Sequence, residues 1–210
     1  AFIFLQEKKS QAAGLRFMIC NKNENSAHIA ADFLKRGKIC VLPTDTVYGF
    51  SGIAENSLQS KFDTDAKIRK IKGREEKKPF IQLVSSPDEI SKYSDFKIPK
   101  PLTQKWPGAL TVIVPLKFPF SEKNATVAFR CPGDLWLRNV IAECGFPIYS
   151  TSVNRSGSPV LDSVCGIEKE FTNEVDLIID DGDKKGSLPS TIVLLENDGW
   201  KVLRQGSVIV

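Results

Sequence analysis

The chain has 210 residues, of which 41% are hydrophobic and 26% charged, and its 29 Lys and Arg residues outnumber 25 Asp and Glu residues to give a net charge of +4. This length suits a single domain, and the hydrophobic content is sufficient for a core, which excludes an intrinsically disordered protein. The longest apolar runs, such as residues 192–195, fall far short of the roughly 18 residues that a membrane helix needs. No charged segment precedes the apolar residues 1–5, so we expect no secretory signal and no membrane association, and hence a cytoplasmic protein.

Cysteine and histidine are too sparse for several common kinds of site. The five cysteines are far apart and form no CxxC pair, which argues against a zinc site or a disulfide framework. His28 is the only histidine, so catalytic triads and two-histidine metal sites are close to excluded. The sequence also lacks a P-loop, a GxGxxG motif and an HExxH motif. These absences disfavour a standard ATPase or dehydrogenase, and we predict no metal site in the protein.

Helices and strands alternate in the first half of the chain. Apolar spacing predicts a helix over residues 26–36, with Ser26 as its N-cap and Gly37 just beyond its end. The run 39–42 is rich in strand-forming residues and is stopped by Pro43, which predicts a buried strand followed by a loop to Gly49. Further along we predict a helix over 63–72, a strand over 80–84 and a short helix over 86–93.

The second half of the chain continues this alternation. The predicted elements are strands over 110–115 and 126–129, a helix over 133–144 that ends at Gly145, a strand over 147–150 and a strand over 175–179. A hairpin over 191–196 and 200–204 is indicated by the turn sequence Asn197-Asp198-Gly199. No internal repeat or low-complexity linker is present. The sequence therefore predicts one α/β domain built on a mixed sheet.

The densest charge lies in residues 67–78, which hold seven Lys or Arg residues and two Glu residues. Such a run is most often a solvated helix face. Gly73, however, would break the helix and direct Lys72 and Arg74 toward one place, as a polyphosphate requires. Both interpretations stay open on these residues alone.

Other polar groups follow predicted strands, where α/β sheets bind ligands. The loop 43–49 carries two threonine hydroxyls, one carboxylate and one tyrosine, and the segment 150–157 carries four hydroxyls and one amide. Arg130 lies at a strand end and could clamp a carboxylate. Each segment could equally be an ordinary turn, and Arg130 could form a surface ion pair.

The order of these segments along the chain is more specific than any one of them. The ordered set comprises Pro43–Gly49, Lys72-Gly-Arg74, Lys78-Pro79, Trp106–Thr111, Arg130–Pro132, Ser150–Asn154 with Ser156-Gly157, and Pro189–Val193. It resembles the YrdC-like family of threonylcarbamoyl-adenylate synthases. Glu75 and Val153 depart from the usual proline and alanine, and the stretch 50–71 is longer than typical.

The resemblance implies a fold and a domain layout. The fold would be α/β (α+β), with a twisted mixed parallel and antiparallel sheet flanked by helices. The domain would span residues 20–208, with residues 1–19 as an N-terminal extension, in the short single-domain form of the family.

The resemblance also implies a reaction: ATP, L-threonine and bicarbonate would give threonylcarbamoyl-AMP and diphosphate, as in a nucleotidyltransferase. Displacement at phosphorus depends mainly on positioning and charge neutralisation, so it needs no histidine base. Mg²⁺ would accompany ATP without a protein cage. The product would supply a tRNA-threonylcarbamoyl transferase complex that modifies the adenosine next to the anticodon, and a weak direct tRNA contact would be compatible with this role.

Site residues follow from the same resemblance, position by position. The family's KxR and SxN motifs match Lys72, Arg74, Ser152 and Asn154. These four residues and Arg204 would bind ATP, with Lys72 and Arg74 as the catalytic pair. Thr46, Tyr48, Arg130 and Ser190 would shape the threonine pocket, where Arg130 would meet the threonine carboxylate.

Two alternatives remain at this point. The basic stretch 67–78 would suit a non-catalytic RNA-binding protein, although no exposed aromatic residues are interleaved with the cations. A carbamoyl-transfer module of the hydrogenase-maturation type would share the motifs, but such modules lie within larger chains that carry zinc-finger-like cysteines.

Overall fold

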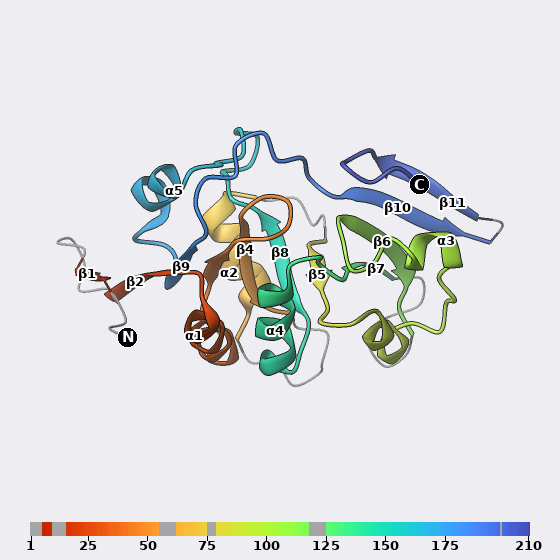
Figure 1. Cartoon of the computed structure of the whole chain (residues 1–210), viewed down its shortest axis with the longest axis horizontal. Helices are drawn as coiled ribbons and strands as arrows, with labels where there is room; N and C mark the ends of the chain where they lie inside the picture. Colours follow the sequence, from red (N-terminus) through yellow and green to blue (C-terminus); the bar gives the residue numbers. More distant parts are fainter. Residues whose placement is uncertain (1–5, 10–15, 55–61, 75–78, 118–124, 198) are drawn as a thin grey trace.

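The computed structural model describes residues 6–9, 16–54, 62–74, 79–117, 125–197 and 199–210. These residues form a single sheet of 11 strands (Figure 1). The strands are β1 (Gln6–Lys9), β2 (Arg16–Asn21), β3 (Cys40–Leu42), β4 (Gly49–Ile53), β5 (Ile81–Leu83), β6 (Leu110–Pro115), β7 (Thr126–Arg130), β8 (Ile148–Ser152), β9 (Leu177–Asp180), β10 (Thr191–Glu196) and β11 (Gly199–Arg204).

The sheet is mixed, with the strand order β1-β2-β9-β3-β4-β8-β5-β7-β6-β10-β11. Strand β9 runs parallel to both of its neighbours, β2 and β3, and the pairs β5/β7 and β6/β10 are also parallel. The remaining neighbours are antiparallel, including β4 and β5 on either side of β8. The predicted fold class, one α/β domain with a mixed sheet, is confirmed.

The helices are α1 (Glu24–Lys35), α2 (Thr64–Lys72), α3 (Lys100–Thr103), α4 (Leu135–Cys144), α5 (Val164–Phe171) and a 3₁₀ helix, η1 (Pro87–Lys92). Helices α1 and α4 lie side by side against one face of the sheet (Figure 1). Helices α2 and α5 pack against the opposite face. Within the described ranges, every helix is too short or too polar to span a lipid bilayer.

Strand β3 shows how the two faces are filled. Cys40 and Leu42 point into the core under α1 and α4, whereas Val41 between them points into the core under α2 and α5. All three residues are fully buried because helices cover both faces. A third core lies under β6, β7 and β10 and includes Leu110 and Phe129.

Helix α1 begins earlier than predicted. Its N-cap is Asn23, whose side-chain oxygen accepts a hydrogen bond from the Ser26 backbone N–H at 2.9 Å. The Ser26 hydroxyl in turn accepts from the Asn23 backbone N–H at 2.8 Å. Ser26 is therefore the third helical residue of a capping box and not the N-cap. Gly37, with φ of +69°, ends this region as expected.

Several other boundaries differ from the sequence prediction. The short helix predicted over 86–93 is the 3₁₀ helix η1. Gly49 starts strand β4 instead of ending a loop, and β8 continues two residues beyond the predicted strand, to Ser152. Strands β1, β2 and β4 and helices α3 and α5 were not predicted, and β2 begins before the expected domain boundary at residue 20. Three residues of the predicted motifs and of the predicted hairpin turn lie outside the described residues: Glu75, Lys78 and Asp198.

We predict that Asn23→Ala lowers the free energy of unfolding by about 1 kcal/mol, because it removes the side-chain acceptor at the start of α1. Urea denaturation would measure this change, with Asn25→Ala as the control, since Asn25 is exposed within the same helix. Equal stability of the two variants would contradict the capping role.

Candidate functional site

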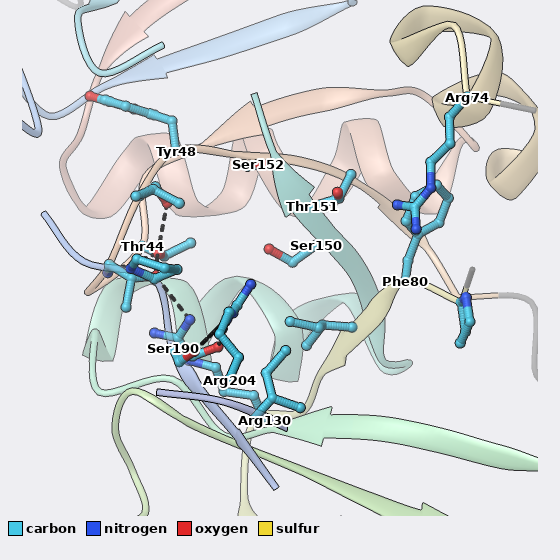
Figure 2. Close-up of a pocket in the computed structure, with 16 residues that line it drawn as sticks. Thr44, Tyr48, Arg74, Phe80, Arg130, Ser150, Thr151, Ser152, Ser190 and Arg204 are labelled. Atoms are coloured by element: carbon cyan, nitrogen blue, oxygen red, sulfur yellow. Dashed lines mark hydrogen bonds between the residues drawn. The ribbon is translucent and has the colours of Figure 1, made fainter. Parts of the chain in front are cut away.

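A cavity of about 370 Å³ opens near the middle of the sheet (Figure 2). Its size lies within the range of small-molecule sites. It is lined by the loop after β3, by residues that precede and begin β5, by the ends of β7, β8 and β11, and by the start of β10. The lining residues are Thr44, Thr46, Val47, Tyr48, Arg74, Pro79, Phe80, Ile81, Arg130, Ser150, Thr151, Ser152, Pro189, Ser190, Ile192 and Arg204.

Arg130 is fixed at the end of β7 by three hydrogen bonds. It donates from Nε to the Gly108 carbonyl at 3.1 Å, from one terminal nitrogen to the Thr46 hydroxyl at 2.9 Å, and from the other to an Asp45 carboxylate oxygen at 2.5 Å. The second oxygen of Asp45 accepts from the Gly133 backbone N–H at 2.9 Å. The Arg130 side chain is therefore held in one orientation at the cavity wall.

Arg130 keeps capacity to bind an anion. A guanidinium group has five N–H donors, and two of those in Arg130 have no partner among the described residues. Burial lowers the pKa of Arg130, and the Asp45 carboxylate opposes this shift. Two remaining donors on a buried, rigid guanidinium suit a carboxylate or a phosphate.

Arg204 lies near Arg130 in the cavity wall. Its Nε and one terminal nitrogen donate to the Ser190 carbonyl at 3.0 and 2.8 Å. The Ser190 hydroxyl pairs with the Thr111 hydroxyl at 2.8 Å. Burial lowers the pKa of Arg204, and its positive charge lowers the pKa of Arg130. This mutual repulsion makes the end of the cavity attractive to anions.

Arg74 approaches the cavity from the opposite side, with its guanidinium 5.2 Å from the centre of the Phe80 ring. The hydroxyls of Ser150 and Thr151 lie between Arg74 on one side and Arg130 and Arg204 on the other (Figure 2). Gly73 has φ of +59°, so the predicted helix break at this glycine is confirmed.

Lys72 is placed differently from Arg74. Only 4% of its surface is exposed, and it does not line the cavity. Its ammonium group donates to the Ser152 carbonyl at 2.6 Å, to the Asn154 carbonyl at 3.0 Å and to the Asn154 side-chain oxygen at 2.8 Å. Desolvation, with a contribution from the Arg74 charge, lowers the pKa of Lys72 to about 8. Lys72 thus supports the wall of the cavity from behind.

Asn154 is also engaged within the protein. Its side-chain oxygen accepts from Lys72 and from the Ser152 hydroxyl, the latter at 2.7 Å. Its side-chain nitrogen donates to the carbonyls of Arg155 and Ser158. Ser152 lines the cavity but Asn154 does not.

The Tyr48 hydroxyl points away from the centre of the cavity (Figure 2). It donates to the Gly182 carbonyl at 2.8 Å and accepts from the Asp181 backbone N–H at 2.9 Å. Burial raises the pKa of this phenol to about 12. The hydroxyl therefore fixes the loop after β9, and the rest of Tyr48 borders the cavity.

The structure brings together most of the residues singled out in the sequence. Arg74, Ser152 and Arg204 from the ATP group share one cavity with Thr46, Tyr48, Arg130 and Ser190 from the threonine group. Lys72 and Asn154 lie behind its wall.

Sequence reasoning did not assign Thr44, Asp45, Ser150 or Thr151. All four belong to the hydroxyl-rich segments 43–49 and 150–157. The sequence indicated these segments as ligand-binding, but it did not show which of their side chains face the cavity. Gly49 of β4 leaves room for the Ser150 side chain. A Cβ atom at position 49 would lie 2.7 Å from the Ser150 hydroxyl oxygen, which is too close for an ordinary contact.

Part of the basic stretch 67–78 is engaged within the fold, although Lys67 and Lys70 are exposed. Lys67 donates to the Gly37 carbonyl at 3.0 Å, and Arg69 pairs with Asp65. Lys72 is buried, and Lys70 is exposed. These four described residues do not form one solvated face, which weakens the interpretation as an RNA-binding surface.

No cluster of potential metal ligands occurs in the described part of the chain, and the cavity lining there contains no carboxylate. All five cysteines are free thiols. Burial raises the pKa of Cys20, Cys131 and Cys144 to about 11, which makes them poor nucleophiles.

Comparison with known proteins identifies the family. The family model of the Sua5, YciO and YrdC proteins, described as "Telomere recombination", matches residues 32–206. The chain belongs to this family. It is 34% identical over 194 residues to a relative from Methanocaldococcus jannaschii, a match that covers 89% of this chain and 90% of the relative.

Two further members of the Sua5/YciO/YrdC family show the same similarity over part of longer proteins. The threonylcarbamoyl-AMP synthase of Bacillus subtilis is 30% identical over 190 residues, covering 85% of this chain and 53% of the relative. The crystal structure of Pyrococcus abyssi Sua5 complexed with L-threonine has a TM-score of 0.76 and 28% identity, covering 90% of this chain and 56% of that chain. The chain thus spans about half the length of these two relatives.

We predict that Lys72→Ala lowers the free energy of unfolding by about 2 kcal/mol or more, since it leaves buried oxygen atoms without their donor. Lys70→Ala, an equal loss of charge from the exposed side of the same helix, should change it by less than about 0.5 kcal/mol. Chemical denaturation of both variants would test this; equal stabilities would show that Lys72 has no supporting role.

Proposed function

We propose that this chain is an L-threonylcarbamoyladenylate synthase, a nucleotidyltransferase that converts ATP, L-threonine and bicarbonate into threonylcarbamoyl-AMP, diphosphate and water. The observation that carries the proposal is a cavity that combines three guanidinium groups with a row of hydroxyls and lacks carboxylates among its described lining residues. This composition suits substrates that are themselves anionic. The name of the Bacillus subtilis relative and the threonine bound to the Pyrococcus abyssi protein support the same assignment.

The chemistry can proceed without a protein nucleophile. The threonine amine would attack the carbon of CO₂ derived from bicarbonate, lose a proton and form a carbamate. A carbamate oxygen would then attack the α-phosphorus of ATP, the bond to the bridging oxygen would break, and diphosphate would leave. The protein's contribution to such a displacement is to align the reactants and to balance the charge on the phosphate oxygens.

The geometry suggests a role for each part of the cavity. We assign Arg130 to the threonine carboxylate because its two remaining donors lie on a rigid, buried group. Arg74 and Arg204 are assigned to the phosphates, and Ser150, Thr151 and Ser152 to phosphate or ribose oxygens. Thr46 and Ser190 complete the threonine end.

Lys72, Asn154 and Tyr48 receive supporting roles. Their polar groups are already paired within the protein, as described above, so we assign them to positioning the 150–154 segment and the loop after β9. The charge of Lys72 would still act on a bound triphosphate from behind the wall.

Mg²⁺ is proposed only as the counterion that accompanies ATP. The described lining residues offer hydroxyls and cations but no carboxylate, so they do not fit a protein-held magnesium site. No step is assigned to the metal. We also propose that the product supplies a tRNA-threonylcarbamoyl transferase complex.

The assay follows directly from the proposed reaction. Incubation with ATP, L-threonine and bicarbonate should yield the adenylate and diphosphate, both detected by mass spectrometry. Omitting either threonine or bicarbonate should abolish both products, because the carbamate needs both. Diphosphate release at the same rate without threonine would exclude this reaction, and turnover of carbamoyl phosphate instead would indicate a carbamoyl-transfer module.

We predict that ATP binds more weakly as the pH rises from about 7 to about 9 (roughly one pH unit on either side of the pKa of Lys72, which is about 8). Lys72 loses its proton over this window, so the cavity loses one nearby positive charge. Bound triphosphate favours the protonated form, and binding should therefore take up protons near the middle of the window.

Isothermal titration calorimetry in buffers of different ionisation enthalpy would measure both effects. Lys72→Arg is the control, because a guanidinium stays charged throughout this range. The same pH dependence in that variant would assign the effect to another group.

A further inference from the structure

The turn that follows β8 closes the C-terminal end of helix α2. The last carbonyls of a helix have no partner within it and need donors from elsewhere. Here the Arg155 guanidinium donates to the Ile71 carbonyl, and the Ser156 backbone N–H donates to the Lys72 carbonyl at 2.7 Å. A cation at this end is also favoured by the helix dipole.

Arg155 is itself held in place by helix α5 and by the turn that follows this helix. Its Nε donates to Glu170 at 3.1 Å, and its terminal nitrogens donate to the Glu174 carboxylate. The guanidinium lies 4.5 Å from the centre of the Phe171 ring. Arg155 therefore connects α5 and the turn after it to the end of α2.

Hydrogen bonds also run from the end of α2 to the segment after β8. Lys72, the last residue of α2, donates to Ser152 and Asn154 in the segment that leads to Arg155. The end of α2 and residues 152–156 are thus joined by hydrogen bonds from both sides. Arg74 follows Lys72 by two residues and lines the cavity.

We infer that Arg155, which does not line the cavity, is a positioning residue that sets the location of Arg74 at the phosphate end. The inference rests on the proposed function, because that function assigns Arg74 to the phosphates. Arg155 touches neither substrate: it acts through the Ile71 carbonyl and the end of α2.

Steady-state kinetics of Arg155→Ala would test this inference. We expect kcat/KM for ATP to fall about tenfold, while KM for threonine stays within about twofold, because the joint lies at the phosphate end. Arg155→Lys should recover part of the loss, since an ammonium group keeps the positive charge but lacks the planar fork that pairs with both oxygens of Glu174. Arg36→Ala is the matched control: it removes an arginine from a surface ion pair with Asp32 and should leave both constants unchanged.

A double-mutant cycle separates positioning from general weakening of the fold. If Arg155 acts through Arg74, the double variant Arg74→Ala/Arg155→Ala should be no more than about twofold worse than Arg74→Ala alone. Multiplied losses, or equal losses for ATP and threonine, would overturn the inference. Circular dichroism checks folding, and if Arg155→Ala unfolds, the same cycle is run with Glu174→Gln.

The outcomes also distinguish this inference from the proposed function. If the wild-type chain binds ATP but makes no adenylate, the proposed reaction is wrong. The double-mutant cycle of Arg74 and Arg155 can then be measured through the Kd for ATP. Additive effects on that Kd would overturn the positioning role. A wild-type chain that binds no ATP would overturn both.

Discussion

The site depends on one buried ammonium group. Placing a lysine charge in the interior costs several kcal/mol unless oxygen atoms replace its water shell. Three oxygens do so for Lys72, at 2.6 to 3.0 Å, and all three belong to Ser152 and Asn154. The pKa of Lys72 is still lowered, mainly by desolvation and also by the Arg74 charge, so the fold holds this charge at some cost. In return, two motifs that are 80 residues apart in the sequence meet at a fixed distance.

The mixed sheet determines which groups can reach the cavity. Strand β8 is antiparallel to both β4 and β5, so the hydroxyl-bearing end of β8 lies beside the start of β4 and the start of β5. The parallel pairing of β5 and β7 then sets Arg130 at the same level as Leu83. A purely parallel sheet would gather its ligand-binding groups at one edge, as in doubly wound folds. Here they come from strand starts and strand ends alike.

The sequence predicted the elements whose signal is local. The run 39–42 has strand-forming residues and a proline stop, and the glycines at 37, 73 and 145 adopt the positive φ values that helix ends require. Strand β4 was missed because Gly49 and Gly52 have low strand propensity, and the strand is held by pairing on both sides. Motif order located the cavity segments, but it could not show that Lys72, Asn154 and the Tyr48 hydroxyl are paired within the protein. Those pairings are long-range contacts, and no local pattern reports them.

The positive charges around the cavity repel one another when no ligand is bound. Burial lowers the pKa of both Arg130 and Arg204, the Arg204 charge lowers that of Arg130 further, and Asp45 opposes the shift of Arg130. Arg74 and Lys72 repel each other in the same way at the other end. An anion placed between the two ends relieves both repulsions, and it meets groups already fixed by hydrogen bonds to the backbone. The entropy lost in fixing these side chains is therefore lost when the chain folds, and not when the ligand binds. A neutral ligand of the same size would gain none of this relief, so charge, more than shape, selects what the cavity accepts.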